Sequence, residues 1–300
     1  MGVLGRVRKK IGDSYLVWRY VKNRKASSLY RRGGNKLNDV QRKILTDLNK
    51  NGIAITHVDE LLPDTNIYKA LQAYTSELEG HKRDAIESAR KEADKISDKK
   101  DFLMQLLGDV PDMNPNDISV RFALQKEIMD IVNGYFGCLT KLKFFNIWHT
   151  FVTHSGPKRS MLWHKDPEDK WIIKVFLYLS DVDEDAGPFV YAPGTHPKGS
   201  VKQKPEWFKE PGRGAERSTD EQMEKIVPRE RWIKALGKRG TLIFAETKGY
   251  HKGGLATKNE RIMYNCLFVS PASKTKEVFT RNDPSDFNSF SLEQRFALIR

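Results

Sequence analysis

The stretch WHKDPEDKWIIKVFLYLSDVDEDAGPFVYAPGTH (residues 163–196) decides the fold class. It contains two apolar runs, 171–179 and 189–191, that are rich in β-branched and aromatic residues and are bounded by Pro, Gly and Asp. That composition and those boundaries predict short strands joined by turns. Further strands are expected at 142–152, 161–164, 241–244 and 261–269. Many short strands with turns between them favour an antiparallel two-sheet sandwich or jelly roll.

The sequence before these strands is mainly helical. Asn38 and Asp39 can cap a helix that runs to about Lys50, and 53–56 is expected to form a short strand. Helical sequence follows over 66–107, with a highly charged solvent-facing part, and another helix is expected over about 117–133. We therefore expect one domain over 38–300, with helical support at 38–140, a β core at 141–270 and a C-terminal tail at 271–300.

The core is interrupted by a long insert, residues 197–238. Within it, Ser218-x-x-Glu221 has the form of a capping box and predicts a helix start. Long connections that have their own structure often cover binding sites, so the insert is predicted to be a lid.

The net charge is concentrated at the N-terminus. The 300 residues carry 52 Lys and Arg against 39 Asp and Glu, a formal charge of +13. Residues 1–32 hold ten of the basic residues and a single acid, Asp13, so the rest of the chain is nearly balanced. A near-neutral body makes nucleic-acid binding unlikely as the main function.

Other composition features favour a globular protein of the cytoplasm. A hydrophobic content of 39% supports a packed core and excludes a disordered chain. The sequence shows no run long enough to span a bilayer and no signal peptide. The two cysteines, Cys138 and Cys266, make no disulfide framework.

The basic segment 1–32, followed by a linker to residue 37, has a helical apolar pattern. Leu4, Val7, Ile11, Tyr15 and Trp18 recur at helical spacing and share one face. Such a basic amphipathic helix can lie on an anionic membrane surface or bind another acidic partner. It can equally dock on the body of the protein and expose its basic face, and the sequence leaves both readings open.

Two histidines and a carboxylate predict a metal site. His164 and Asp166 lie two residues apart in an expected extended segment, so they point the same way. His251 follows another Gly-led strand, and Arg261 begins the next apolar strand. Two His and one carboxylate form the facial ligand set of non-haem Fe(II) oxygenases. A guanidinium at position 261 is suited to bidentate binding of a dicarboxylate.

These residues stand in a sequence context that resembles a known family. Trp163-His-Lys-Asp166, the run from Lys174 to Phe189, Pro193-Gly-Thr-His196, Gly240-Thr-Leu-Ile-Phe and His251-Lys-Gly-Gly together resemble the phytanoyl-CoA dioxygenase family of Fe(II)/2-oxoglutarate-dependent oxygenases. The resemblance is strongest over 142–270 and does not cover the arm or the insert. It implies a double-stranded β-helix (jelly roll, cupin-like) with helices packed outside and a basic N-terminal helix.

The resemblance also implies roles for the site residues. Iron would be held by His164, Asp166 and His251, and the distal carboxylate of 2-oxoglutarate would pair with Arg261. With O2, the products would be succinate, CO2 and an oxidised substrate. Related halogenases lack a carboxylate at the position of Asp166, so its presence favours hydroxylation or another oxidation.

Strand alternation suggests further site residues. Lys174 and Tyr178 share a face, as do Arg261 and Asn265, so these residues are candidates for 2-oxoglutarate binding. The alternative is that residues 173, 175 and 177 fill the core while Lys174 and Tyr178 face outward. Weaker candidates for substrate contact are His149, Trp163, His196, Tyr250 and Lys252.

The sequence therefore predicts an Fe(II)/2-oxoglutarate-dependent hydroxylase of a small or mid-sized substrate. An acidic substrate, or one linked to a lipid or a sugar, is compatible with this prediction. Desaturation or cyclisation by the same chemistry is an alternative. A non-catalytic binding module on the same fold is another. The oligomeric state is not predicted, and the expected location is the cytoplasm, with peripheral membrane association as an option.

Overall fold

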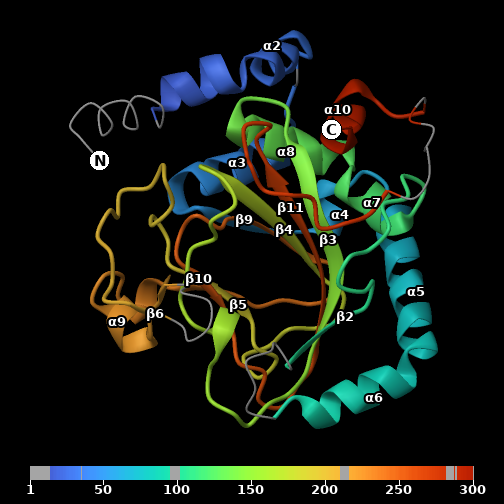
Figure 1. Cartoon of the computed structure of the whole chain (residues 1–300), viewed down its shortest axis with the longest axis vertical. Helices are drawn as coiled ribbons and strands as arrows, with labels where there is room; N and C mark the ends of the chain where they lie inside the picture. The colour runs from blue at the N-terminus through green and yellow to red at the C-terminus, as the bar shows by residue number, and fades with distance from the viewer. Residues whose placement is uncertain are drawn as a thin grey trace.

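The computed structural model describes residues 14–34, 36–94, 102–209, 216–281, 287 and 289–299. It is a mixed α and β structure in which helices surround antiparallel sheets (Figure 1). Leu4, Val7 and Ile11 of the predicted amphipathic pattern lie outside the described residues.

The larger sheet has six strands in the order β1-β9-β4-β11-β3-β2, and every neighbouring pair is antiparallel. The strands are β1 (Ile53–His57), β2 (Leu103–Gln105), β3 (Lys141–Thr150), β4 (Ile172–Tyr178), β9 (Thr241–Glu246) and β11 (Arg261–Val269). The apolar sequence of β4 is nearly continuous because both faces of this sheet are covered.

The smaller sheet has three antiparallel strands in the order β10-β5-β8. These are β5 (Phe189–Tyr191), β8 (Ile233–Ala235) and β10 (His251–Gly253). A separate ribbon pairs β6 (Phe208–Lys209) with β7 (Glu216–Arg217). Because β8 pairs with β5, the end of the predicted insert belongs to this sheet.

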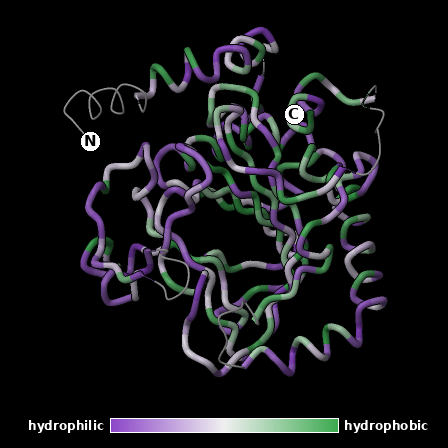
Figure 2. Tube along the Cα trace, viewed as in Figure 1, coloured by the Kyte–Doolittle hydropathy of each residue, from purple (hydrophilic) through white to green (hydrophobic). Residues whose placement is uncertain are grey.

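Helices other than Asp220–Glu224, which packs in a separate cluster with Trp163, cover the outer face of the larger sheet and alternate hydrophilic and hydrophobic residues along their length (Figures 1 and 2). Buried residues of the helices and of β3, β4, β9 and β11 form one hydrophobic core there. The helices are α2 (Arg24–Arg32), α3 (Asp39–Asn51), α4 (Val58–Leu61), α5 (Asn66–His81), α6 (Arg83–Glu92), α7 (Ile118–Ala123), α8 (Lys126–Phe136), α9 (Asp220–Glu224) and α10 (Leu292–Leu298), with shorter helical turns at Val17–Lys22, Arg159–Met161 and Arg229–Arg231.

The capping residues explain several boundaries. The Asn38 side chain accepts a hydrogen bond from the Gln41 amide, and the Gln41 side chain accepts one from the Asn38 amide, so α3 begins with a capping box. The helix ends at Gly52, whose φ of +85° is a left-handed conformation that favours glycine. These features agree with the predicted helix and with the strand β1 that follows it.

Four local predictions were wrong. Part of the predicted helix over 66–107 is strand β2, which pairs with the edge of β3. The expected helix over 117–133 is two helices that break at Leu124 and Gln125. The expected strand 161–164 contains the end of a helical turn, with isolated bridges only at Trp163 and His164. The capping box of α9 is formed by Thr219 and Gln222, one residue later than predicted, because Ser218 is used in a backbone bridge to Trp163.

The described part of the N-terminal segment is docked on the body. Trp18 is 3% exposed, and its ring centroid lies 4.6 Å from that of Trp171. The Asn23 side chain accepts a hydrogen bond from the Ala272 amide at 3.0 Å. The docked reading therefore holds for residues 14–34, although Leu16 and Val21 remain exposed. No helix in the described ranges is long and apolar enough to cross a bilayer.

Candidate metal centre and cosubstrate pocket

Backbone pairing brings His164 and His251 together. The His164 amide donates to the His251 carbonyl at 3.0 Å, and the reverse bond is 3.1 Å. Their ring centroids are 4.3 Å apart. The amide of Asp166 donates to the Thr247 carbonyl at 2.9 Å. This bond holds Asp166 beside the segment that connects β9 to His251. The three predicted ligands thus form one buried group whose ligand atoms all lie within 4.8 Å of one another.

Hydrogen bonds orient both imidazoles toward the carboxylate. His164 Nδ1 lies 2.8 Å from the Leu162 carbonyl oxygen, and His251 Nδ1 lies 3.0 Å from that of Gly249. A carbonyl can only accept, so each Nδ1 carries the proton and each Nε2 keeps a lone pair. The Nε2 atoms face Asp166, at 3.8 Å from Oδ1 for His164 and 3.5 Å from Oδ2 for His251.

The electrostatics favour the protonation states that a cation needs. Burial lowers the pKa of His164 well below its ordinary value and also lowers that of His251, so both rings are neutral. Burial opposes ionisation of Asp166, but the ammonium of Lys174 holds the pKa of this carboxyl well below its usual range. Lys174 Nζ lies 2.7 Å from Asp166 Oδ2.

The three residues line a cavity of about 750 Å³ between the two sheets. Arg261 and Asn265 of β11 line the same cavity, as the strand alternation predicted. Arg261 is buried, and its Nη1 donates to the Gly187 carbonyl oxygen, but its Nε has no hydrogen-bond partner among the described residues. Within the same part of the chain, both polar side-chain atoms of Asn265 are also buried without a partner. Unsatisfied buried donors are costly, so these atoms indicate a polar ligand.

The side chains of β4 divide between cavity and core. Lys174 and Phe176 line the cavity, whereas Ile173, Val175 and Leu177 belong to the core under the helices. Tyr178 lies on the cavity side, where its hydroxyl donates to the Ala235 carbonyl at 2.7 Å and its ring belongs to the cluster with Phe176. It supports the Arg261 end of the pocket but does not line the cavity itself.

Two of the predicted substrate histidines lie elsewhere. His149 points away from the cavity because its strand neighbours Trp148 and Thr150 face it. Its Nε2 lies 2.7 Å from Glu260 on the outer face. His196 is fully buried, and its Nε2 lies 3.1 Å from the Asn49 carbonyl oxygen. Burial lowers the pKa of His196 to about 4, as expected for a neutral residue of the protein interior.

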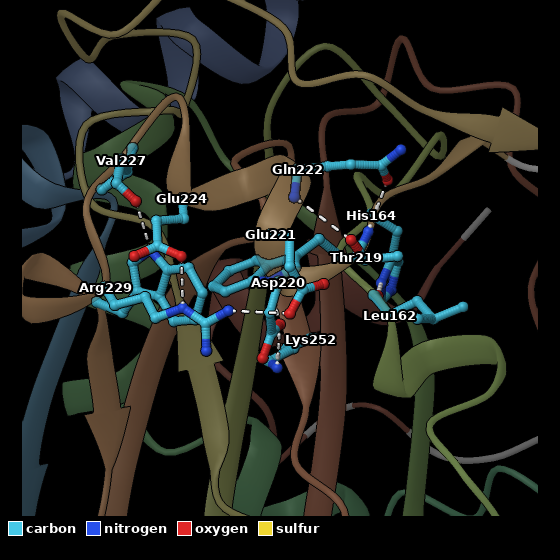
Figure 3. Close-up of polar contacts among 12 residues, drawn as sticks. Leu162, His164, Thr219, Asp220, Glu221, Gln222, Glu224, Val227, Arg229 and Lys252 are labelled. Atoms are coloured by element: carbon cyan, nitrogen blue, oxygen red, sulfur yellow. Dashed lines mark hydrogen bonds and ion pairs between the residues drawn. The ribbon is translucent and has the colours of Figure 1, made fainter.

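Trp163 and Lys252 do not line the cavity either, and both contact the insert through Asp220. Trp163 Nε1 donates to Asp220 Oδ1 at 2.7 Å. Lys252 Nζ forms an ion pair with the same atom at 2.5 Å (Figure 3). Each of these residues is the direct neighbour of a histidine of the centre. The Asp220 carboxylate of helix α9 therefore contacts both the segment that carries His164 and the segment that carries His251. Of the substrate candidates, only Tyr250 lines the cavity.

Sequence reasoning missed Asp220 and Arg217. Arg217 lies on β7 and lines the cavity, close enough for its charge to act on both histidines. Ser218, which follows it, pairs with Trp163 in an isolated bridge. The only sequence signal was the capped helix in a long insert, and the pairing partners of that insert are far away in the sequence.

The donor set fits a divalent cation such as Fe(II). Two neutral imidazole nitrogens and one ionised carboxylate oxygen converge, and both histidines are oriented by carbonyl hydrogen bonds, as metal-binding histidines commonly are. This arrangement of fold and site defines the class of non-haem iron, 2-oxoglutarate-dependent oxygenases. A model of the phytanoyl-CoA dioxygenase family matches residues 56–263, and the chain belongs to this family.

Solved structures provide a further comparison. EctD from S. alaskensis, with 2-oxoglutarate and 5-hydroxyectoine, superposes with a TM-score of 0.50 at 15% identity, covering 84% of this chain and 85% of EctD. ThoJ, a non-heme monooxygenase, gives 0.48 at 18% identity, covering 81% and 90%. The epimerase SnoN, in complex with Fe3+, alpha ketoglutarate and nogalamycin RO, gives 0.48 at 13%, covering 80% and 87%. No curated protein matches the sequence.

Proposed function

We propose that this oxygenase hydroxylates a small or mid-sized molecule while 2-oxoglutarate is converted to succinate and CO2. The observation that carries the proposal is the convergence of His164, Asp166 and His251 beside buried, unpartnered polar atoms of Arg261 and Asn265 in one cavity. Bound iron would supply oxygen activation and the site for coordinating the 2-oxo acid.

Individual residues would have separate roles in binding the metal. The two histidines would hold the metal through Nε2, and Asp166 would balance its charge. A carboxylate at this position favours hydroxylation over halogenation. Lys174 would hold Asp166 ionised and oriented until the metal takes over that role, because its ammonium is the nearest cation to the carboxylate.

Arg261 and Asn265 would bind 2-oxoglutarate. A guanidinium matches the geometry of the distal carboxylate, and its Nε needs an acceptor. The Asn265 amide, with a donor and an acceptor both unsatisfied, can bind a second polar group of the same molecule. Tyr178 would help to position Arg261, and apolar cavity walls such as Phe176 and Phe189 would limit the access of water.

The two antiparallel sheets are consistent with the halves of a double-stranded β-helix, and we propose that 38–300 forms one such domain. Residues 197–209 and 216–232 of the predicted insert then act as a cover. Trp207, Arg217 and Ser218 from this segment line the cavity, which supports that role.

A substitution of Asp166 tests the proposed function. Asp166→Ala should abolish succinate formation from 2-oxoglutarate, by about 100-fold or more, because one metal ligand is lost. Asp185→Ala is the matched control, since this surface carboxylate pairs only with Lys258 and its neighbours. Metabolite extracts treated with wild type should gain a species one oxygen atom heavier. Equal succinate formation by wild type and Asp166→Ala would contradict the proposal.

We further propose that the N-terminal segment rests on an anionic membrane surface. Leu16, Tyr20 and Val21 are 65%, 48% and 68% exposed beside basic residues such as Lys22 and Arg24. Each Lys or Arg near such a surface contributes about 1 kcal/mol. Leu16→Glu/Val21→Glu, which leaves Trp18 docked, should reduce sedimentation with phosphatidylglycerol vesicles. Equal sedimentation of both forms would exclude this surface.

A further inference from the structure

Most lysines with short polar contacts on the described surface are neutralised by a nearby carboxylate. Lys234 lies 2.7 Å from Glu184, Lys238 lies 2.9 Å from Asp181, and Lys258 lies 2.9 Å from Asp185. A different arrangement is found beside the cavity. Four lysines, which we call the mouth lysines, gather there without a carboxylate within 4 Å among the described residues: Lys165, Lys202, Lys204 and Lys248.

The contacts of the mouth lysines are to neutral groups. Lys165 Nζ donates to the Thr195 carbonyl at 3.2 Å and lies 4.2 Å from the centroid of the Tyr250 ring. Lys202 Nζ donates to the Pro197 carbonyl at 2.8 Å, and Lys248 Nζ donates to the Asp166 carbonyl at 3.2 Å. None of the four forms an ion pair within 4 Å among the described residues, and Lys202, Lys204 and Lys248 lie close enough for their charges to lower the pKa of Lys165.

The mouth lysines are placed to meet a ligand that enters the cavity. Lys165 and Lys204 line it, and Lys202 and Lys204 come from the insert that covers it. Arg217 adds a cation further in, near the histidines. Besides Asp166, the carboxylates Glu168 and Glu216 line the cavity; among the described residues neither forms an ion pair with a mouth lysine, although the charge of Lys248 acts on Glu168.

Part of the cavity wall is aromatic. Phe144, Trp148, Phe176 and Phe189 line the same cavity as Lys165 and Lys204. The cavity therefore combines cationic side chains with an aromatic wall. A molecule that fills it would have an anionic group at one end and an apolar body that reaches the centre.

We propose that the substrate is a phosphate ester, and that the mouth lysines bind its phosphate while the apolar part is oxidised. Uncompensated like charges repel, and a bound dianion removes that repulsion. Several ammonium groups around one mouth suit a group with three acceptor oxygens and nearly two charges, since lysine binds phosphate as a point charge. This inference rests on the proposed function and names the substrate class of the same site.

Phenyl phosphate is a suitable probe because it joins a phosphate to an aromatic body. Its binding is measured by calorimetry on the full chain loaded with Ni(II) and 2-oxoglutarate, which keeps the site filled and redox-inert. We expect wild type to bind it, Lys202→Ala/Lys204→Ala to bind it about tenfold more weakly, and added salt to weaken both. The control is Lys234→Ala/Lys238→Ala, which removes the same charge from two exposed lysines that are paired with carboxylates.

Other outcomes would overturn the inference. It fails if wild type does not bind phenyl phosphate, if the two double variants bind it equally, or if phenol binds wild type as tightly. Competition with phosphatidylcholine vesicles that contain phosphatidic acid identifies the source of the phosphate. Displacement of the probe indicates a lipid-borne phosphate, and no displacement indicates a soluble ester.

Succinate formation without substrate separates this inference from the proposed function. If wild type forms succinate from 2-oxoglutarate but ignores phenyl phosphate, only the substrate class is wrong. If wild type neither binds 2-oxoglutarate nor forms succinate, the proposed function itself is wrong.

Discussion

The two sheets that enclose the cavity hold their functional residues in different ways. In the larger sheet, β11 pairs with β3 along its whole length and with β4 over seven residues, and Arg261 and Asn265 are carried on that long strand. In the smaller sheet, β10 spans only three residues, and His251 stands at its start. His164 is held by an isolated bridge.

The two parts of the site, the cosubstrate residues and the metal centre, are therefore held in place by different elements. The cosubstrate residues rest on continuous strand pairing and a large core, so the sheet alone positions them. The metal centre rests on short pairings and receives extra support from the insert, through Asp220. Substitutions can therefore affect one half and spare the other.

The largest expected effect separates cosubstrate binding from metal binding. Arg261→Ala should raise the KM for 2-oxoglutarate about 100-fold, because a buried carboxylate would lose its charged partner. Metal affinity, measured by Ni(II) titration, should change little, since β11 does not supply a ligand. Arg229→Ala is the control, because Arg229 pairs with Glu221 and Glu224 on the surface. A parallel loss of Ni(II) binding would show that the two halves are not independent.

A smaller effect is expected from the link between the insert and the metal centre. Asp220→Ala should lower metal affinity about tenfold, because Trp163 and Lys252, which flank the two histidines, lose their shared acceptor. The KM for 2-oxoglutarate should change less than the metal affinity. Glu224→Ala is the control, because it removes a negative charge from the same helix and should leave the metal affinity unchanged. If both variants bind Ni(II) like wild type, the short pairings are sufficient without the insert.

A separate prediction, on stability and not on binding, concerns the pH dependence of unfolding at the end of β9, where the chain leaves the larger sheet toward His251. Burial raises the pKa of Glu246 from 4.5 to about 8. The folded state thus keeps a proton that the unfolded state loses, and the free energy of unfolding should fall as pH rises between these two values, by about 1.4 kcal/mol per pH unit. Above that window the loss is complete.

Glu246→Gln removes this titration. Thermal unfolding of the two proteins, compared between about pH 5 and pH 8, should show a steeper fall in Tm for wild type. The slope is the readout because the amide also alters local hydrogen bonds, which shifts both ends of the curve. Identical slopes would mean that Glu246 is ionised in the folded protein.

The sequence by itself determined the mixed helix and strand class of the fold and the family, and it singled out the three side chains that the structure brings together as a candidate metal site. Strand alternation fixes which side chains share a face, so Arg261 with Asn265 and Lys174 with Phe176 were predictable from local order alone. In the same way, the two-residue spacing of His164 and Asp166 places both side chains on one face of an extended segment. These are short-range properties of the backbone.

Only the tertiary structure decided which face of each strand lines the cavity and which residues from distant parts of the sequence contact one another. His149 and His196 looked like site residues by proximity in sequence, but one faces the outer surface and the other packs near Gly52. Asp220, Arg217, Lys202 and Lys204 reach the site through an insert. Their contacts join residues tens of positions apart, and local periodicity carries no information about such long-range pairing.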